Sequence, residues 1–167
     1  MSTKNHKEHQ TKDDTRFMRK AIQQATDGMN SGQCGPFGAI IVKDGKIVGR
    51  GNNKVTSTND PTAHAEVVAI RDACKNLGTF QLDDCTIYTS CEPCPMCLGA
   101  IYWARPKRIV YACDKKDAAA IDFDDAFIYK EIELPIAQRS IKTEQLLRDE
   151  GLKVFKAWEQ KTDKEEY

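Results

Sequence analysis

Three of the seven cysteines lie within one short segment, and this cluster constrains the fold more than any other feature of the chain. The segment reads Cys91-Glu92-Pro93-Cys94-Pro95-Met96-Cys97, and Pro93 is typical of a residue that opens a helix. Residues three positions apart share one face of a helix, so Cys94 and Cys97 can bind the same ion. Thiolates at this spacing suit zinc, and the positive end of a helix stabilises them. The segment therefore predicts a metal site at the start of a helix.

A second segment, Thr62-Ala63-His64-Ala65-Glu66, lies earlier in the chain and also opens a predicted helix. His64 and Glu66 are two positions apart, about 200° around a helix, so they cannot both point sideways at one target. They can instead flank something that lies beyond the first turn.

If the two helix starts converge, His64, Cys94 and Cys97 supply three zinc ligands and leave the fourth tetrahedral position to water. An open position is typical of a catalytic zinc site, where the metal brings the pKa of water down toward ~7. A nearby carboxylate can receive the proton of that water and redeliver it. We therefore expect Glu66 to be the catalytic proton carrier and Zn²⁺ to be the cofactor.

Cys91 supports an alternative in which the site is closed and purely structural. A fourth thiolate would complete a Cys₃His zinc module that staples the fold and catalyses nothing. Two observations oppose this interpretation: Cys91 falls at the end of a predicted strand, and a structural site gives no reason for Glu66.

The remaining pattern alternates helices with strands, and Asp44-Gly45 is a strong signal for a two-residue hairpin. Helices are predicted from residue 16 to 29, from 61 to a stop at Gly78, from 93 to near 105, and around 123–132 and 143–158. Strands are predicted over residues 37–42, 46–50, 85–89 and 108–112. This order indicates an α/β fold, a three-layer α/β/α domain with a mixed central sheet and a helical C-terminal segment.

The length of 167 residues suits one domain, which we expect over residues 16–167. Residues 1–15 are almost wholly polar, and we expect a disordered arm there.

Charge and hydropathy exclude several kinds of partner. Lys and Arg total 25, as do Asp and Glu, so no basic field attracts phosphate backbones and we expect no nucleic-acid partner. The apolar runs are far shorter than the roughly 20 residues of a spanning helix, so we expect no membrane partner. The clustered cysteines and the polar N-terminus favour reduced thiols in the cytoplasm.

The two metal segments together resemble the H-x-E and P-C-x-x-C pattern of zinc nucleobase deaminases. The runs 59–66 and 89–97, and Phe123-Asp124-Asp125-Ala126-Phe127, are also similar to small bacterial guanine deaminases of the cytidine deaminase superfamily. This resemblance implies a cytidine-deaminase-like fold and the conversion of guanine to xanthine and ammonia, in purine catabolism or salvage.

The same resemblance assigns roles in binding a purine base, the expected small-molecule partner. It implies that Asn53 hydrogen-bonds the base, that Phe37 packs on its face, and that Asp125 accepts hydrogen bonds from ring N–H groups. The alternatives are a turn asparagine, a core phenylalanine and a surface acid.

The resemblance further implies a homodimer that exchanges C-terminal segments, with Tyr167 closing over the substrate of the partner chain. Exchange of an identical element is a low-cost route to a dimer. Phe155 and Trp158 are candidates for anchoring the crossing helix. The simpler alternative is a frayed terminal tail.

Two other deaminases share the zinc motifs. A tRNA adenosine deaminase acts on a flipped base and needs a basic surface, which this neutral chain with its acidic end lacks. The motifs alone do not separate a cytosine deaminase from a guanine deaminase.

Overall fold

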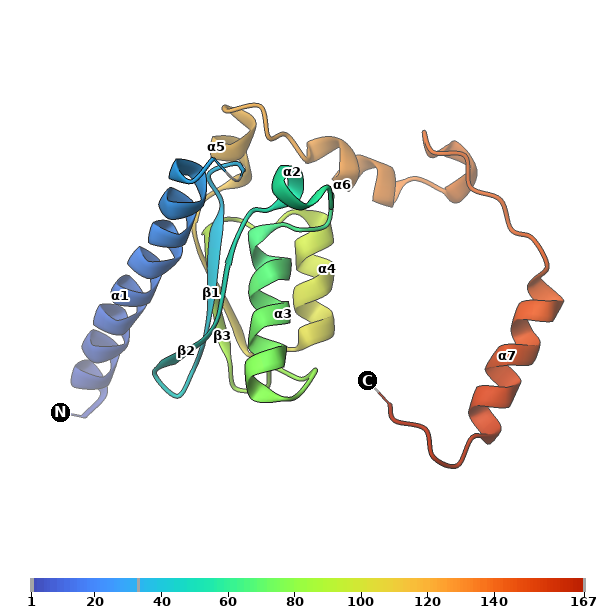
Figure 1. Ribbon diagram of the computed structural model, residues 1–167, viewed down its shortest axis with the longest axis horizontal. Coiled ribbons are helices and arrows are strands. Elements are labelled where there is room, and N and C mark those ends of the chain that lie inside the picture. The colour runs from blue at the N-terminus through green and yellow to red at the C-terminus, as the bar shows by residue number, and fades with distance from the viewer. Residues whose placement is uncertain (1, 33, 167) are drawn as a thin grey trace. The chain divides into compact units, whose positions relative to one another are not determined.

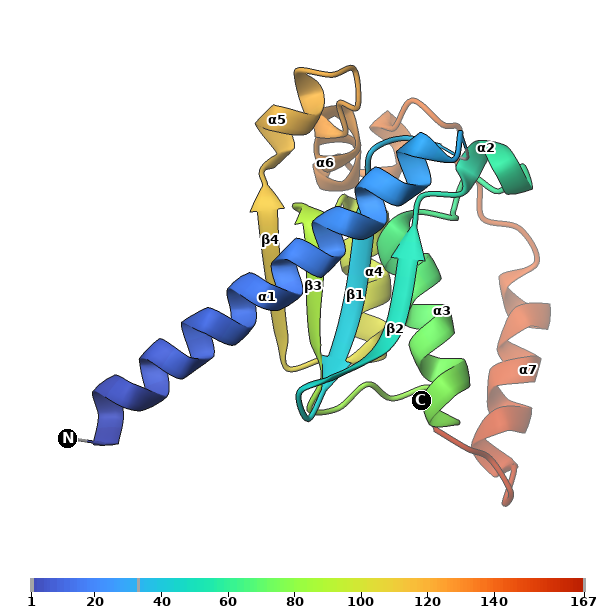
Figure 2. The same ribbon diagram turned by 60° about the vertical axis from the view of Figure 1, so that its left-hand side comes forward.

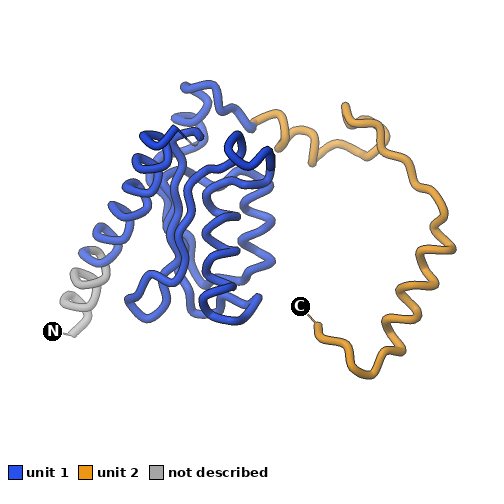
Figure 3. The backbone as a smooth tube through the Cα atoms, viewed as in Figure 1, with its two compact units in different colours: residues 1–125 blue, residues 126–167 orange. Residues whose placement is uncertain are grey.

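The computed structural model describes residues 2–32 and 34–166, with side chains described from Lys12 onward. The chain divides into two compact units, Met1–Asp125 and Ala126–Tyr167, coloured blue and orange in Figure 3. The expectation of one domain over residues 16–167 stays a prediction. Among the described residues, no helix is long and apolar enough to cross a membrane.

The first unit contains four strands and five helices in the described residues. In chain order these are α1 (Ser2–Asn30), β1 (Gly38–Lys43), β2 (Lys46–Asn52), α2 (Val55–Thr58), α3 (Ala65–Leu77), β3 (Thr86–Cys91), α4 (Pro95–Ala104), β4 (Arg108–Cys113) and α5 (Lys115–Ala119). The predicted strands and the three long helices are all present. The short helices α2 and α5 were not predicted, because segments of four and five residues carry no helical periodicity.

The four strands form one mixed sheet in the order β2-β1-β3-β4. Strand β1 pairs antiparallel with β2 and β3, whereas β3 pairs parallel with β4. The β1–β2 turn has positive φ at both Asp44 (49°) and Gly45 (72°), as a type I′ hairpin requires. The predicted hairpin and the mixed sheet are therefore confirmed.

Helices cover both faces of this sheet, so the three-layer prediction is confirmed. Figures 1 and 2 show α1 on one face and the pair α3 and α4 on the other. The core has two parts. Phe17 of α1 packs with Ile40 and Tyr88 on one face of the sheet. Ala69 of α3 packs with Ile41 and Ile87 on the other. Two glycines of β2 permit the close approach of α3, since a Cβ on Gly49 would lie 2.5 Å from the carbonyl oxygen of Ala69. Gly51 faces the backbone of Ala65 in the same way, which sets the start of α3 tightly against the sheet.

Helix α1 begins before Arg16, where the sequence had predicted its start. Residues 12–15 are part of the helix, so the expectation of a disordered arm was wrong for them. Asp14 provides the reason, because both of its oxygens accept hydrogen bonds from Arg108, one of them at 2.9 Å from Nη1. The Tyr88 hydroxyl donates to the same carboxylate at 2.6 Å. These bonds tie the helix to β3 and β4 through one acidic residue.

The second unit contains α6 (Ala126–Glu133), a 3₁₀ turn η1 (Ile136–Gln138) and α7 (Arg148–Gln160). The two C-terminal helices were predicted correctly in kind, but each begins later than expected. For α7 the cause is Leu147, whose left-handed φ of 53° interrupts helical geometry just before Arg148.

Candidate metal centre and active site

Two helix N-termini supply the proposed metal ligands. His64 is the N-cap residue of α3 and Cys94 is the N-cap residue of α4. Both have extended backbone, with ψ of 156° and 168°, so neither is inside its helix. Glu66 follows in the first turn of α3.

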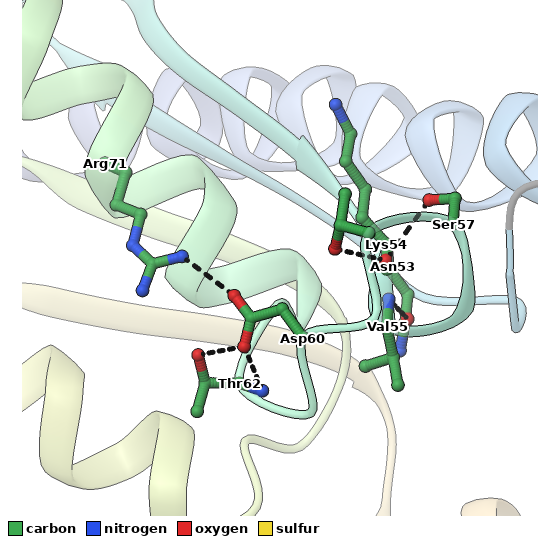
Figure 4. A network of polar contacts seen from close by, with 8 residues as sticks. Asn53, Lys54, Val55, Ser57, Asp60, Thr62 and Arg71 are labelled. Atoms are coloured by element: carbon green, nitrogen blue, oxygen red, sulfur yellow. Dashed lines mark hydrogen bonds and ion pairs between the residues drawn. The ribbon is translucent and has the colours of Figure 1, made fainter.

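Helix α3 starts later than the predicted residue 61 because Asp60 organises a turn ahead of it. One carboxylate oxygen of Asp60 accepts hydrogen bonds from the Thr62 backbone N–H at 2.8 Å and from its hydroxyl at 2.7 Å. The other oxygen forms an ion pair with Arg71 at 3.5 Å, as Figure 4 shows. A local side-chain bond of this kind competes with helical backbone geometry. Because of this turn, His64 is the N-cap residue of the helix and does not lie within it.

The ligand atoms of His64, Cys94 and Cys97 lie together as predicted. All lie within 4.8 Å of one another. The Sγ atoms of Cys94 and Cys97 are 3.6 Å and 3.5 Å from His64 Nδ1. Tetrahedral zinc with bonds of about 2.3 Å to sulfur and about 2.05 Å to nitrogen places such atoms about 3.6 Å apart. The donor set and its spacing therefore fit a zinc ion.

The electrostatics of the two thiols also favour a bound cation. The Cys97 thiol donates toward the Cys94 sulfur, which lowers the pKa of Cys94 to about 4. The same contact, together with burial, raises the pKa of Cys97 far above its usual value. One thiolate therefore forms readily and the second does not. A dication that bonds both sulfurs replaces the remaining proton and stabilises the second thiolate.

Glu66 lies beside this triad and is almost fully buried, with 6% of its surface exposed. Its Oε2 is 3.3 Å from Cys97 Sγ, and its Oε1 accepts a hydrogen bond of 3.0 Å from the Thr89 hydroxyl. Burial raises the pKa of the Glu66 carboxyl. The carboxyl group thus has one oxygen toward the metal ligands and one toward the sheet.

Cys91 does not join the metal cluster, although it is close in sequence. Among the described residues, the group able to hold an ion consists of His64, Cys94 and Cys97. The Cys91 thiol instead points to the carbonyl oxygen of Asp114 at 3.6 Å. The closed Cys₃His alternative is therefore wrong for this structure, because the Cys91 thiol at the end of β3 contacts Asp114 and not the ligand triad.

The residues expected to bind a base lie on loops of the first unit. Asn53 follows β2 and is buried, with 6% of its surface exposed, and its Oδ1 accepts a hydrogen bond of 3.0 Å from Val55 N–H (Figure 4). Phe37 is half-buried and meets the ring of Phe123 edge-on, with the ring centroids 4.9 Å apart.

Asp125 is half-buried at the end of the first unit. Desolvation raises its pKa, and the negative charge of Cys94 raises it further. Tyr167 lies outside the described residues.

Two residues near the site were not singled out from the sequence. Thr89 is only 1% exposed and bonds Glu66 from the facing strand. Phe123 was quoted only as part of a motif, yet it packs on Phe37. A threonine in a strand that also contains Thr86 and Ser90 is a weak signal, because threonine is common in strands.

The comparisons with known proteins agree with this geometry. The family described as "Cytidine and deoxycytidylate deaminase zinc-binding region" matches residues 11–113. That range spans all four strands and the complete triad. The chain belongs to this family of zinc-binding deaminases.

Two relatives and one solved structure show which members of the family the chain resembles. It is 59% identical over 151 residues to the guanine deaminase of Bacillus subtilis, covering 90% of this chain and 97% of the relative. The X-ray structure of a Bacillus subtilis guanine deaminase superposes with a TM-score of 0.90 at 58% identity, covering 92% of this chain and 98% of that one. A tRNA-specific adenosine deaminase of Aquifex aeolicus is 40% identical over 106 residues, covering 63% of this chain and 70% of the relative.

Proposed function

We propose that this protein is a zinc-dependent guanine deaminase, which hydrolyses guanine to xanthine and ammonia. The observation that carries the proposal is the triad of His64, Cys94 and Cys97 with Glu66 beside it, in a chain 59% identical to nearly the whole of a guanine deaminase. The reaction consumes one water: its oxygen replaces the exocyclic nitrogen on the ring carbon, and the amine departs as ammonia.

His64, Cys94 and Cys97 hold the zinc ion in this proposal. Zinc at such an open site acidifies water and so supplies the nucleophile at neutral pH. The Cys97 backbone N–H lies 3.5 Å from the Cys94 sulfur and helps to stabilise its negative charge. These residues act by binding and orientation, not by transferring protons.

Glu66 performs the proton transfers. Its Oε2 faces the ligand cluster, where it can receive the proton released by the nucleophilic water and deliver it to the adjacent ring nitrogen. The second proton then passes through the same carboxyl group to the departing amine. Burial of Glu66 keeps bulk water from competing for these protons.

Asn53, Phe37 and Asp125 bind the base in this proposal. With its Oδ1 bonded to Val55 N–H, Asn53 presents its amide nitrogen as a donor for a ring acceptor. Asp125 accepts hydrogen bonds from purine N–H groups, and a base without a matching donor leaves its carboxylate unpaired. Phe37 covers one face of the ring, and its edge contact with Phe123 fixes its orientation.

We further propose a homodimer that exchanges C-terminal segments and places Tyr167 over the partner's base. Taken by itself, the second unit buries none of its described residues. Helix α7 exposes apolar side chains, with Val154 at 67%, Phe155 at 70% and Trp158 at 43%. An apolar helix face of this kind needs another surface to cover it, and a second copy of the chain supplies one.

The seven free cysteines suit a cytoplasmic location.

Ammonia release from a panel of free bases, nucleosides and tRNA tests the substrate assignment. The proposal predicts that zinc-loaded protein deaminates free guanine faster than cytosine, cytidine or tRNA adenosine. The formal net charge of zero supports this order, because a tRNA enzyme needs a basic surface for phosphates. Faster turnover of any of the other substrates overturns the assignment to guanine while leaving the zinc deaminase family intact.

A further inference from the structure

The carboxyl group of Glu66 is held from two sides by unlike partners. On one side, the Thr89 hydroxyl donates to Oε1 at 3.0 Å, and on the other, Oε2 lies 3.3 Å from Cys97 Sγ. Thr89 is 1% exposed and Glu66 is 6% exposed. A hydrogen bond to a charged group at this depth is stronger than one at the surface.

The strand does not need this hydroxyl for its own packing. Thr89 lies in β3, where it is opposite Ala39 of β1 and Tyr111 of β4. Successive side chains of a strand point to opposite faces, so Tyr88 packs beneath α1 while Thr89 points toward α3. Valine has the same shape and suits a fully buried strand at least as well. The hydroxyl therefore serves its partner Glu66 rather than the sheet.

We propose that Thr89 is a positioning residue for the proton transfers of Glu66. Its hydroxyl occupies Oε1 and stops the carboxyl group from turning, so Oε2 alone is left to accept and deliver the proton at the metal side. This inference rests on the proposed deaminase function. It adds a residue that touches neither the metal ligands nor the base-binding residues in any described contact.

The proposal predicts a specific kinetic signature. Removing the hydroxyl leaves zinc, the base-binding residues and the fold in place but lets the carboxyl group rotate. Geometry at the reacting atoms affects the chemical step more than ground-state binding. We therefore expect kcat to fall by about 10- to 100-fold while KM changes little.

Two substitutions at position 89 separate the hydroxyl from the packing. Thr89→Val keeps the shape and removes the hydroxyl, whereas Thr89→Ser keeps the hydroxyl and removes a methyl group. The proposal predicts a low kcat for the valine variant, a kcat near wild type for the serine variant, and full zinc content in both. Thr86→Val is the matched control, since Thr86 is a buried threonine of the same strand on the opposite face. It should leave kcat unchanged.

Crystal structures of the zinc-loaded variants provide a second readout that needs no substrate. In Thr89→Val the Glu66 carboxyl group should turn away from its wild-type orientation, and in Thr89→Ser it should keep it. If the valine variant does not fold, Thr89→Ala removes both the hydroxyl and the methyl group, and its comparison with Thr89→Ser then isolates the effect of the hydroxyl.

Four results would overturn the proposal: wild-type kcat in the valine variant, an unmoved carboxyl group in its structure, loss of its zinc, or an equal loss of kcat in the serine variant. The kinetic arm uses whichever base the wild-type protein deaminates fastest. A wrong choice of guanine therefore shows in the wild-type assay and leaves the test of Thr89 valid.

Discussion

His64 and Cys94 occupy equivalent positions in the fold, each as the N-cap residue of a helix, and His64 Nδ1 lies 3.6 Å from Cys94 Sγ. The equivalence arises because both segments reach their helix through an extended residue that a turn or a proline holds in place. Two helix starts then meet at one point on the same side of the sheet. Their positive ends favour thiolates and a carboxylate there.

Cys91 is dispensable for zinc binding, because its thiol faces the carbonyl oxygen of Asp114 and not the ligand triad. Cys91→Ala should therefore retain one zinc per chain, whereas Cys94→Ala should lose it. Metal analysis of the purified variants checks this. Equal loss of zinc in both variants contradicts the three-ligand site and restores the structural alternative.

The proposed mechanism requires Glu66 for turnover and not for binding the metal. Glu66→Gln keeps the size and the buried position of the side chain but cannot carry a proton. It should retain zinc and lose kcat by at least the 10²- to 10⁴-fold typical of acid–base catalysis. Zinc content and steady-state rates are measured on the same preparation, and a variant that keeps its activity removes Glu66 from the mechanism.

In the proposed function, Asp125 determines which base is accepted. Asp125→Asn removes the charge but keeps the shape, so kcat/KM for guanine should fall by about 10-fold or more with zinc content unchanged. Rates with guanine are compared with rates for any weaker substrate found in the panel. An equal effect on every base shows that Asp125 does not read the purine.

The carboxylate of Asp14 stabilises the docking of α1, and this stability depends on pH. The hydrogen bond from Arg108 holds the Asp14 pKa below its usual value. A carboxyl group whose pKa is lower in the folded state contributes its stability above the unfolded pKa of about 3.9, and that contribution is lost as the pH falls further. Asp14→Asn should cost about 1–2 kcal/mol at pH 7, since the pair is only partly exposed.

Denaturant unfolding of wild type and Asp14→Asn at pH 7 and near pH 3 checks this account. The difference in unfolding free energy should shrink at the lower pH. A difference that stays constant shows that the carboxylate charge of Asp14 contributes nothing.

Exchange of the C-terminal segment predicts complementation between two inactive chains. Deletion of Tyr167 should abolish activity and spare zinc, because in the proposed dimer this residue closes over the partner's base. Mixed dimers of Glu66→Ala chains with chains lacking Tyr167 should each regain one working site, giving about a quarter of wild-type activity after random remixing. Verified mixed dimers without activity would mean that each tail serves its own chain.

Much of the site could be predicted because its chemistry is local in sequence. The spacing of Cys94 and Cys97, and the carboxylate two residues after His64, define a metal site and a proton carrier before any fold is known. The hairpin at Asp44-Gly45 and the glycine stop at Gly78 were equally local, and both are confirmed.

What could not be predicted depends on contacts between distant residues. Helix α1 begins before Arg16 because Asp14 accepts a hydrogen bond from Arg108, a residue 94 positions away. The bond between Thr89 and Glu66 joins residues 23 positions apart on a strand and a helix. Neither contact has a periodic signal, since each exists only once the sheet has formed.

The central claim is tested most directly by titrating metal-free protein with zinc and measuring xanthine formation from guanine at each amount of added metal. The account predicts that activity is absent without zinc, rises in proportion to added metal and reaches its maximum at one zinc per chain. Xanthine formation by the metal-free protein, or none at full zinc occupancy, would contradict it.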